Sequence, residues 1–181
     1  SAVTTGLNNI AIGYQALATN VDGDQNVAIG TSALLTFEAS SDGEGKNVAV
    51  GHNALTLLTT GTENVFIGAA AGDELLTGIQ NIAVGGYAMG EATGNAITGN
   101  NNTCLGYSAG YVLEGAAHSN TLIGQGAGSD METGTSNTCV GLGAGNAITT
   151  GADNTIIGSG ADVTGVGAST QIAIGKDTNS S

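Results

Sequence analysis

The segment Asn9-Ile-Ala-Ile-Gly13 opens a pattern that runs through the whole chain. The same order of residue types (Asn, a β-branched residue, any residue, an aliphatic residue, Gly) returns at Asn26-Val-Ala-Ile-Gly30 and in eight further copies, the last beginning with Gln171. Successive copies are separated by 17, 21, 17, 17, 21, 18, 17, 17 and 17 residues. Self-similarity at a fixed period is typical of repeat proteins. The pattern predicts ten copies of one unit in a single domain, residues 1–181.

The columns of the repeat predict its geometry when the Asn of each copy is counted as position 0. Position +3 is Ile, Val or Leu and position +4 is Gly in all ten copies, and position +7 is Ala in nine. We expect +1 and +3 to face a packed interior. We expect the +4 glycine to supply a positive φ or a close approach between coils, and the +7 alanine to lie on a second short strand. Two short strands joined by glycine turns make one coil of an all-β, parallel β-solenoid (β-roll) of about ten 17-residue coils.

The Asn column has two possible structural roles. Stacked Asn side chains can form a ladder in which each amide bonds to the copies above and below. Alternatively, each Asn serves its own turn as a left-handed residue. Either role is structural, and neither makes the Asn a ligand.

Composition and charge argue against several classes of protein. With 32 Gly, no Pro, 40% hydrophobic and only 9% charged residues, the chain is too apolar for disorder. The longest stretch without a strongly polar side chain, residues 82–90, is far shorter than the ~20 residues of a membrane-spanning helix. A net charge of -13 argues against nucleic acid as a partner. The first residues lack the features of a targeting segment, so either processing has removed such a segment or the chain is a fragment of a longer polypeptide, and we expect the fragment.

Position +2 indicates that the chain assembles with others. It is apolar in every copy, from Ala11 to Ala173. If +1 and +3 face the interior, +2 faces outward, and strands that are apolar on both faces are buried on both. We therefore expect several parallel chains packed around an axis.

Enzyme chemistry finds little support in the sequence. His52 and His118 are the only histidines, and a solenoid would hold them roughly 14 to 19 Å apart along its axis. Gly124-Gln-Gly-Ala-Gly128 resembles a dinucleotide loop, but the same column carries another glycine turn one repeat later. The Asp73-Glu74 pair would point to opposite faces if extended. We expect no enzymatic activity, no cofactor and no metal site.

The two cysteines share a column. Cys104 and Cys139 are both at +2, two repeats apart. Their Cα atoms should therefore lie about 9.6 Å apart, beyond the ~7 Å that a disulfide spans. We expect two free, buried thiols.

The units from Asn9 to Ala16 and from Asn26 to Ala33 resemble the head repeats of trimeric autotransporter adhesins, and similar repeats occur in bacteriophage tail fibres. The resemblance covers essentially the whole chain, although this unit is longer and replaces a second-strand Leu with Gly at Gly72, Gly110, Gly128 and Gly145. It implies a left-handed β-roll assembled as a parallel homotrimer. It also implies a structural, host-attachment segment of a longer tail fibre, located in the virion.

Two other functions stay open. The first is the head of a bacterial trimeric surface adhesin, located at the cell surface. The second, more distant, is a solenoid ice-binding protein, which needs a flat array of paired Thr rows. Only one partial row is present, four positions before the Asn (Thr5, Thr60, Thr77, Thr98, Thr133, Thr150), so the sequence favours the fibre.

Recognition of a host surface glycan or protein would fall on two kinds of position. Position +5 varies freely and predicts a solvent-facing column, in which Tyr14 and Tyr107 could contact a receptor. Two four-residue insertions, near residues 38–45 and 91–100, are the loops on which binding is often built. Their candidate contact residues are Glu38, Asp42, Glu44, Glu91 and Asn95.

Overall fold

The computed structural model describes residues 6–39, 44–90 and 96–178. These residues form ten three-residue strands and no helix. The strands are β1 (Ile10–Ile12), β2 (Val27–Ile29), β3 (Val48–Val50), β4 (Val65–Ile67), β5 (Ile82–Val84), β6 (Thr103–Leu105), β7 (Thr121–Ile123), β8 (Thr138–Val140), β9 (Thr155–Ile157) and β10 (Ile172–Ile174).

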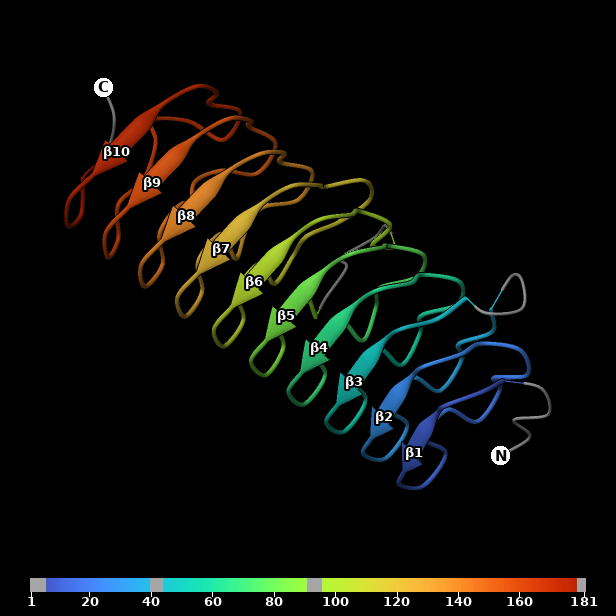
Figure 1. Ribbon diagram of the computed structural model, residues 1–181. Helices are drawn as coiled ribbons and strands as arrows, with labels where there is room; N and C mark the ends of the chain where they lie inside the picture. The colour runs from blue at the N-terminus through green and yellow to red at the C-terminus, as the bar shows by residue number, and fades with distance from the viewer. Residues whose placement is uncertain (1–5, 40–43, 91–95, 179–181) are drawn as a thin grey trace.

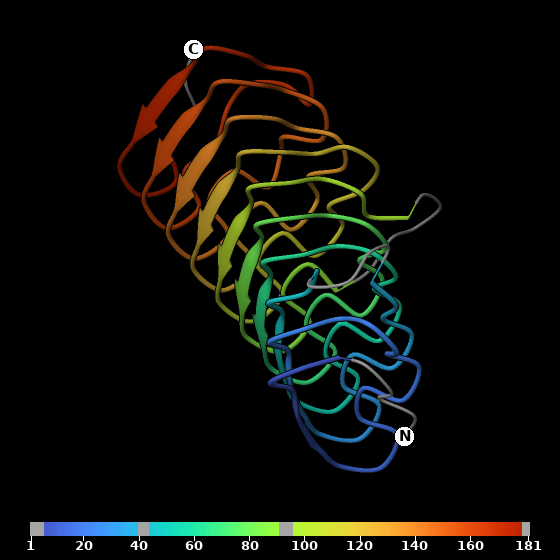
Figure 2. The ribbon, with the colours of Figure 1, turned by 45° about the vertical axis from the view of Figure 1, so that its right-hand side comes forward.

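The strands form one parallel sheet along the length of a rod. Each strand pairs with the next in chain order, so the sheet runs from β1 to β10 without a crossover. Every pair keeps the repeat in register, as with Ala49 opposite Phe66. β1 and β10 lie at opposite ends, and the strands occupy one side of the rod with the turns on the other (Figures 1 and 2). The predicted parallel β-solenoid with coils of about 17 residues is confirmed.

The strands face the opposite way from our expectation. Position +2 points into the coil, and Ala28, Phe66 and Cys104 are fully buried. Positions +1 and +3 point outward, so that Ile12 is 60% exposed and Ile67 is 40% exposed. The expectation that +1 and +3 face the interior is therefore wrong. Alternation along a strand separates two sets of residues, but both sets are apolar here, and hydrophobicity alone does not choose between them.

The predicted second strand is a turn. Residues at +6 and +8 adopt left-handed backbone, as Ser32 (φ 56) and Leu34 (φ 52) do, so the chain curls instead of extending. Hydrogen bonds between coils nevertheless continue through it. The Ser32 N–H donates to the Tyr14 carbonyl at 2.9 Å, and the Leu34 N–H donates to the Ala54 carbonyl at 2.9 Å. The +7 alanine, such as Ala33, is buried as its small size suggests.

The interior of most described coils is filled by side chains from +2, +7, +8 and +11. The +2 and +8 residues share one space. Phe66 occupies the volume beside Gly72, where an added Cβ would collide with the Phe66 ring. A small +2 residue is matched instead by a large +8 residue, as Ala28 is by Leu34. The glycines at +8 thus make room for large +2 side chains within the same coil.

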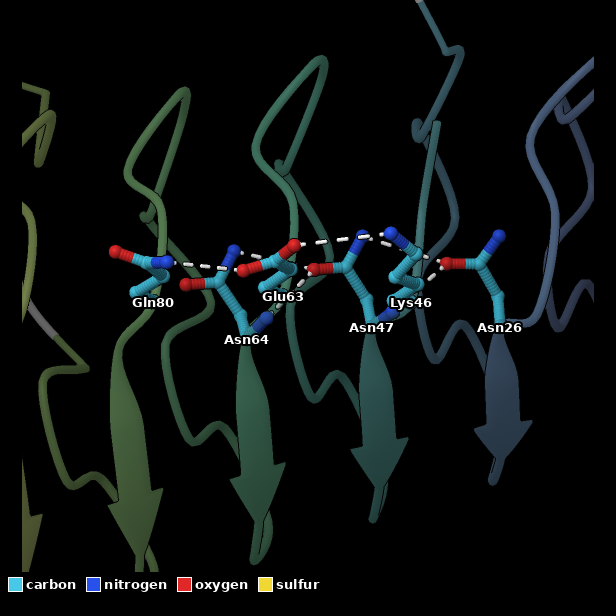
Figure 3. A network of polar contacts seen from close by, with 6 residues as sticks. All are labelled: Asn26, Lys46, Asn47, Glu63, Asn64 and Gln80. Atoms are coloured by element: carbon cyan, nitrogen blue, oxygen red, sulfur yellow. Dashed lines mark hydrogen bonds and ion pairs between the residues drawn. The ribbon is translucent and has the colours of Figure 1, made fainter. Parts of the chain in front are cut away.

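The Asn column forms a continuous buried ladder (Figure 3). Asn64 Oδ1 accepts the Asn81 backbone N–H at 2.9 Å and the Asn81 side-chain amide at 3.2 Å. The Asn64 amide donates to Asn47 Oδ1 at 3.1 Å and to the Gly78 carbonyl at 2.8 Å. The ladder interpretation is confirmed. The left-handed residue is the one before each Asn, as with Glu63 (φ 60), so the alternative role is wrong.

The +4 glycine meets both demands that the sequence suggested. Gly30 has a φ of 132°, which side-chain-bearing residues rarely adopt. A Cβ there would also collide with the Gly51 carbonyl of the next coil. The glycine lets the chain leave the strand while adjacent coils stay at strand spacing.

Candidate functional site

The outward face of the sheet is a continuous, uncharged surface that runs along the described strands of the rod. We call it the sheet face, and it consists of the +1 and +3 side chains of β1 to β10. No charged residue occurs among these twenty positions, although the chain carries fifteen acidic and two basic residues. Ten stacked strands give the face a length of roughly 43 Å. Its exposed aliphatic residues include Ile10, Ile12, Ile67, Ile82, Val84, Ile123, Ile157, Ile172 and Ile174.

The composition of the sheet face changes along the rod. β1 to β5 and β10 carry Ile or Val at +1, whereas β6 to β9 carry Thr. Extended exposed apolar surfaces of this kind mark interaction sites in soluble proteins. The geometry therefore suits contact with another apolar surface that is equally long and straight.

A polar column borders the sheet face at the amino ends of the strands (Figure 3). Lys46 Nζ lies 3.7 Å from Glu63 Oε1, and the Gln80 amide donates to Glu63 Oε2 at 2.9 Å. The Lys46 and Glu63 side chains are about half exposed, so this ion pair contributes little to stability. The column keeps one edge of the apolar face hydrated.

The candidate contact residues of the first insertion are partly engaged in the fold. Glu38 is half-buried, and its Oε1 accepts the Val21 N–H at 3.3 Å. The Glu44 carbonyl accepts the Asp24 N–H at 2.9 Å. Asp42 lies outside the described residues, as do Glu91 and Asn95 of the second insertion.

The +5 column faces solvent, and its two tyrosines differ in their surroundings. Tyr14 is exposed and makes no ring contact with another described aromatic residue. Tyr107 lies against Tyr87, with ring centroids 5.9 Å apart and an interplanar angle of 73°. Tyr111 also contacts Tyr87, with ring centroids 6.4 Å apart and an interplanar angle of 74°.

Sequence reasoning missed Tyr87 and Tyr111 because they occupy different columns of the repeat. Tyr107 is at +5 of its coil, Tyr111 is at +9, and Tyr87 is at +6 of the coil before. The sequence contained one indication of this contact: Tyr87 and Tyr107 occupy adjacent repeat positions, +6 and +5, in successive coils. Stacking places such positions side by side.

The residues considered for catalysis do not come together. His52 and His118 are both exposed and lie in different coils. Across residues 6–39, 44–90 and 96–178, no group of three His, Cys, Asp or Glu side chains is close enough to hold a metal ion. Residues 124–128 form a turn with no helix after it, as the sequence predicts.

Cys104 and Cys139 are free and buried, as expected. They stack in one column with Leu122 between them. Burial raises the pKa of the Cys104 thiol well above its ordinary value, and the nearby Cys139 raises it further. Burial, with a smaller contribution from Asp162, raises the pKa of Cys139 to about 12. Both thiols stay protonated near neutral pH and act as core side chains.

Comparisons with protein-family models, curated proteins and solved structures found no match. Among the described residues no helix has the length and hydropathy needed to cross a bilayer. The sheet face and the tyrosine group are therefore interpreted from their own geometry.

Proposed function

We propose that the chain is a structural, non-enzymatic segment of a trimeric viral tail fibre that takes part in host attachment. Three parallel chains pack around a common axis through their sheet faces. The observation that carries the proposal is a ten-strand face that is partly exposed, mostly aliphatic and free of charge, on a chain whose net charge is -13. Copies of the same chain offer a surface of matching length, chemistry and repeat spacing.

The repulsion between acidic chains also favours this arrangement. Carboxylates are absent from the sheet face and scattered over the rest of the sequence. Chains that meet through the sheet face bury apolar side chains, while their charges stay in water. A parallel arrangement keeps the repeats of neighbouring chains level along the axis. The same rod would also serve as the head of a bacterial surface adhesin, for which a stalk and membrane anchor in the full-length protein would be the evidence.

Two substitutions on the sheet face test the proposal. Ile67→Asp combined with Val84→Asp places two carboxylates on the face, at side chains that are already partly exposed. A charge-matched control, Ala69→Asp combined with Gln125→Asp, places them in the solvent-facing +5 column. Light scattering should give three times the 17.4 kDa chain mass for the wild type and the control. The sheet-face variant should dissociate.

Two results would contradict the proposal. The first is a stable, folded wild-type monomer at micromolar concentration. The second is a sheet-face variant that keeps the wild-type mass, because charges buried without partners are strongly unfavourable. Circular dichroism on each sample separates dissociation from unfolding.

Ice binding is a second candidate, favoured by one specific observation. The expectation of a single Thr row is wrong, because Thr103, Thr121, Thr138 and Thr155 form a second row at the outward +1 position of successive strands. The neighbouring +3 column is aliphatic, and the other six strands carry no outward Thr. The fibre is therefore the preferred function. Thermal hysteresis in a solution of the wild-type protein would reverse that preference.

A further inference from the structure

Three of the four tyrosines in the chain gather at one place on the surface. We call Tyr87, Tyr107 and Tyr111 the tyrosine cluster. Tyr107 is 56% exposed, Tyr87 is 43% exposed and Tyr111 is half-buried. The chain has six aromatic residues, and the two phenylalanines are both in the core. Every exposed aromatic side chain except Tyr14 therefore belongs to this cluster.

The backbone at Tyr87 adopts a conformation that is unfavourable for a bulky residue. Its φ is +57°, in the left-handed region. Other copies of the repeat place Gln, Ser, Asn, Ala, Gly or Asp at this position. The left-handed Leu residues at +8 gain full burial in the core, whereas Tyr87 remains 43% exposed. Core packing does not account for an aromatic ring at this position.

The surroundings of the cluster leave its rings accessible. Gly86 precedes Tyr87 and carries no side chain, and a Cβ there would lie 3.5 Å from the Tyr107 ring. In the next coil, Gln125 occupies the position equivalent to Tyr107 and is exposed. The Gly126 N–H donates to the Tyr107 carbonyl at 2.9 Å, which holds these coils side by side. The exposed Gln125 therefore lies one coil beyond Tyr107 in the same solvent-facing column.

The ring geometry narrows the class of ligand. A cation held between two ring faces lies within about 6 Å of each centroid on opposite sides, so the rings stand well apart. Tyr87 and Tyr107 touch edge to face at 5.9 Å and leave no such gap. Nucleic acids and anionic lipids are disfavoured by the net charge of -13. An uncharged ligand that stacks on one open ring face suits this site.

We propose that the tyrosine cluster is a carbohydrate-binding site for a neutral sugar ring of a cell-surface glycan. A pyranose presents aliphatic C–H groups on one face, which pack on a tyrosine ring, and hydroxyls at its edge. Those hydroxyls hydrogen-bond with the tyrosine O–H groups and with the Gln125 amide. The assignment rests on the proposed attachment role, because it supplies the rod with a receptor contact.

Tyrosine fluorescence gives a direct readout, because the chain contains no Trp. The wild-type protein is first applied to an array of neutral and acidic oligosaccharides. The glycan with the strongest signal is then titrated while tyrosine emission is recorded. Tyr107→Ala should weaken binding by about tenfold to hundredfold. Tyr107→Phe should stay within a few-fold of the wild type, because the stacking ring is kept.

Tyr14→Ala is the matched control, because Tyr14 occupies the same +5 column, is exposed and lacks a ring partner among the described aromatics. It should bind as the wild type does. Equal affinities of the Tyr107→Ala and Tyr14→Ala variants would overturn the proposal, as would an array without any bound neutral glycan.

The molecular mass of each sample separates this proposal from the proposed function. If Tyr107→Ala loses the trimer mass while Tyr14→Ala keeps it, the cluster is a contact between chains and the sugar site is wrong. If the wild type is a monomer that still binds a neutral glycan through Tyr107, the trimer proposal fails and the sugar site stands.

Discussion

Phe66 and Gly72 show how single residues balance the volume of a coil. In the first eight coils, Phe, Leu or Cys at +2 is paired with Gly at +8, and Ala at +2 is paired with Leu or Met at +8. Gly128 beside Leu122 repeats the arrangement, since a Cβ there would lie 2.8 Å from a Leu122 methyl carbon. The two positions therefore act as one packing unit.

A double-mutant cycle tests this unit. Phe66→Ala alone should destabilise by about 3–5 kcal/mol through the cavity it leaves, and Gly72→Leu alone by about 1–3 kcal/mol through overpacking. The double variant should lie within about 1.5 kcal/mol of the wild type. Its coil would match the Ala28–Leu34 and Ala49–Leu55 coils, which already stack on each other. Urea unfolding midpoints give the comparison, and additive losses would contradict shared packing.

Sequence reasoning identified the columns of the repeat correctly but misjudged the structural roles of several of them. The +8 glycines looked like substitutions in a strand, because the Phe66–Gly72 complementarity links residues six positions apart across a turn. Tyr87 and Tyr111 were missed for a related reason. A comparison of the repeats pairs each residue with those at the same position in other coils. The tyrosine cluster instead joins residues at different positions of neighbouring coils.

At the scale of elements, the Asn ladder and the three-residue strands form one hydrogen-bonded corner. Each strand is too short to hold its register alone, and the ladder adds buried side-chain hydrogen bonds at the amino end of every strand between the first and the last. Asn47, Asn64 and Asn81 are fully buried. The corner therefore combines backbone and side-chain pairing at each step along the rod.

Asn64→Ala should be among the most damaging single substitutions in the chain. It leaves the buried Asn81 N–H and the Gly78 carbonyl without the partners that Asn64 supplies. Each unsatisfied buried group costs about 1–3 kcal/mol, so we expect a loss of roughly 2–6 kcal/mol in the free energy of unfolding. Thermal or urea unfolding provides the measurement.

Asn9→Ala is the internal control for the ladder. Asn9 makes the equivalent bonds to Asn26 and Gly23, but it is only half-buried in the first coil. Water can replace its lost partners, so its effect should be clearly smaller. Equal losses for Asn9→Ala and Asn64→Ala would show that ladder burial is not the source of the stability.

The residue pattern of the strands predicts some features of the fold and not others. The period, the parallel pairing and the Asn corner followed from the sequence, because Asn64 and its equivalents recur at almost constant spacing. The sequence did not reveal which face of each strand is buried. Phe66 at +2 and Ile67 at +3 are both apolar, so the buried face depends on which set fits beside the +7 alanine and the +8 side chain. Which set fits is decided by the packing of the whole closed coil, so the strand pattern alone does not predict it.

At the scale of the whole molecule, the rod is a stack in which each coil contacts only its neighbours. The free energy of unfolding of a stacked repeat protein is approximately the sum of contributions from its repeats and from the interfaces between them. Deleting residues 64–80 would join Glu63 to Asn81, so a left-handed residue would still precede each Asn. The shortened chain should fold with nearly unchanged thermal stability. Small-angle scattering should show a rod shorter by one strand spacing, about 4.8 Å.

Deleting residues 64–71 provides the contrast. This removes the fourth strand and its +7 alanine but leaves the rest of the coil, so the following Asn no longer lies above Asn47. The variant should lose cooperative unfolding. A half-coil deletion as stable as the full-coil deletion would mean that the register of the stack is not what holds the rod together.

In the first eight coils a large side chain and a small one are matched within the same coil, so coils of the two kinds stack on each other, as the Ala49 coil does on the Phe66 coil. Recombination between similar repeats in a gene of this kind would therefore produce chains that differ by whole coils and still fold. The reach of the rod from base to tip could then change in small, equal increments during evolution. A lineage could adjust how far the proposed attachment surface projects while the packing chemistry of the repeats stays the same.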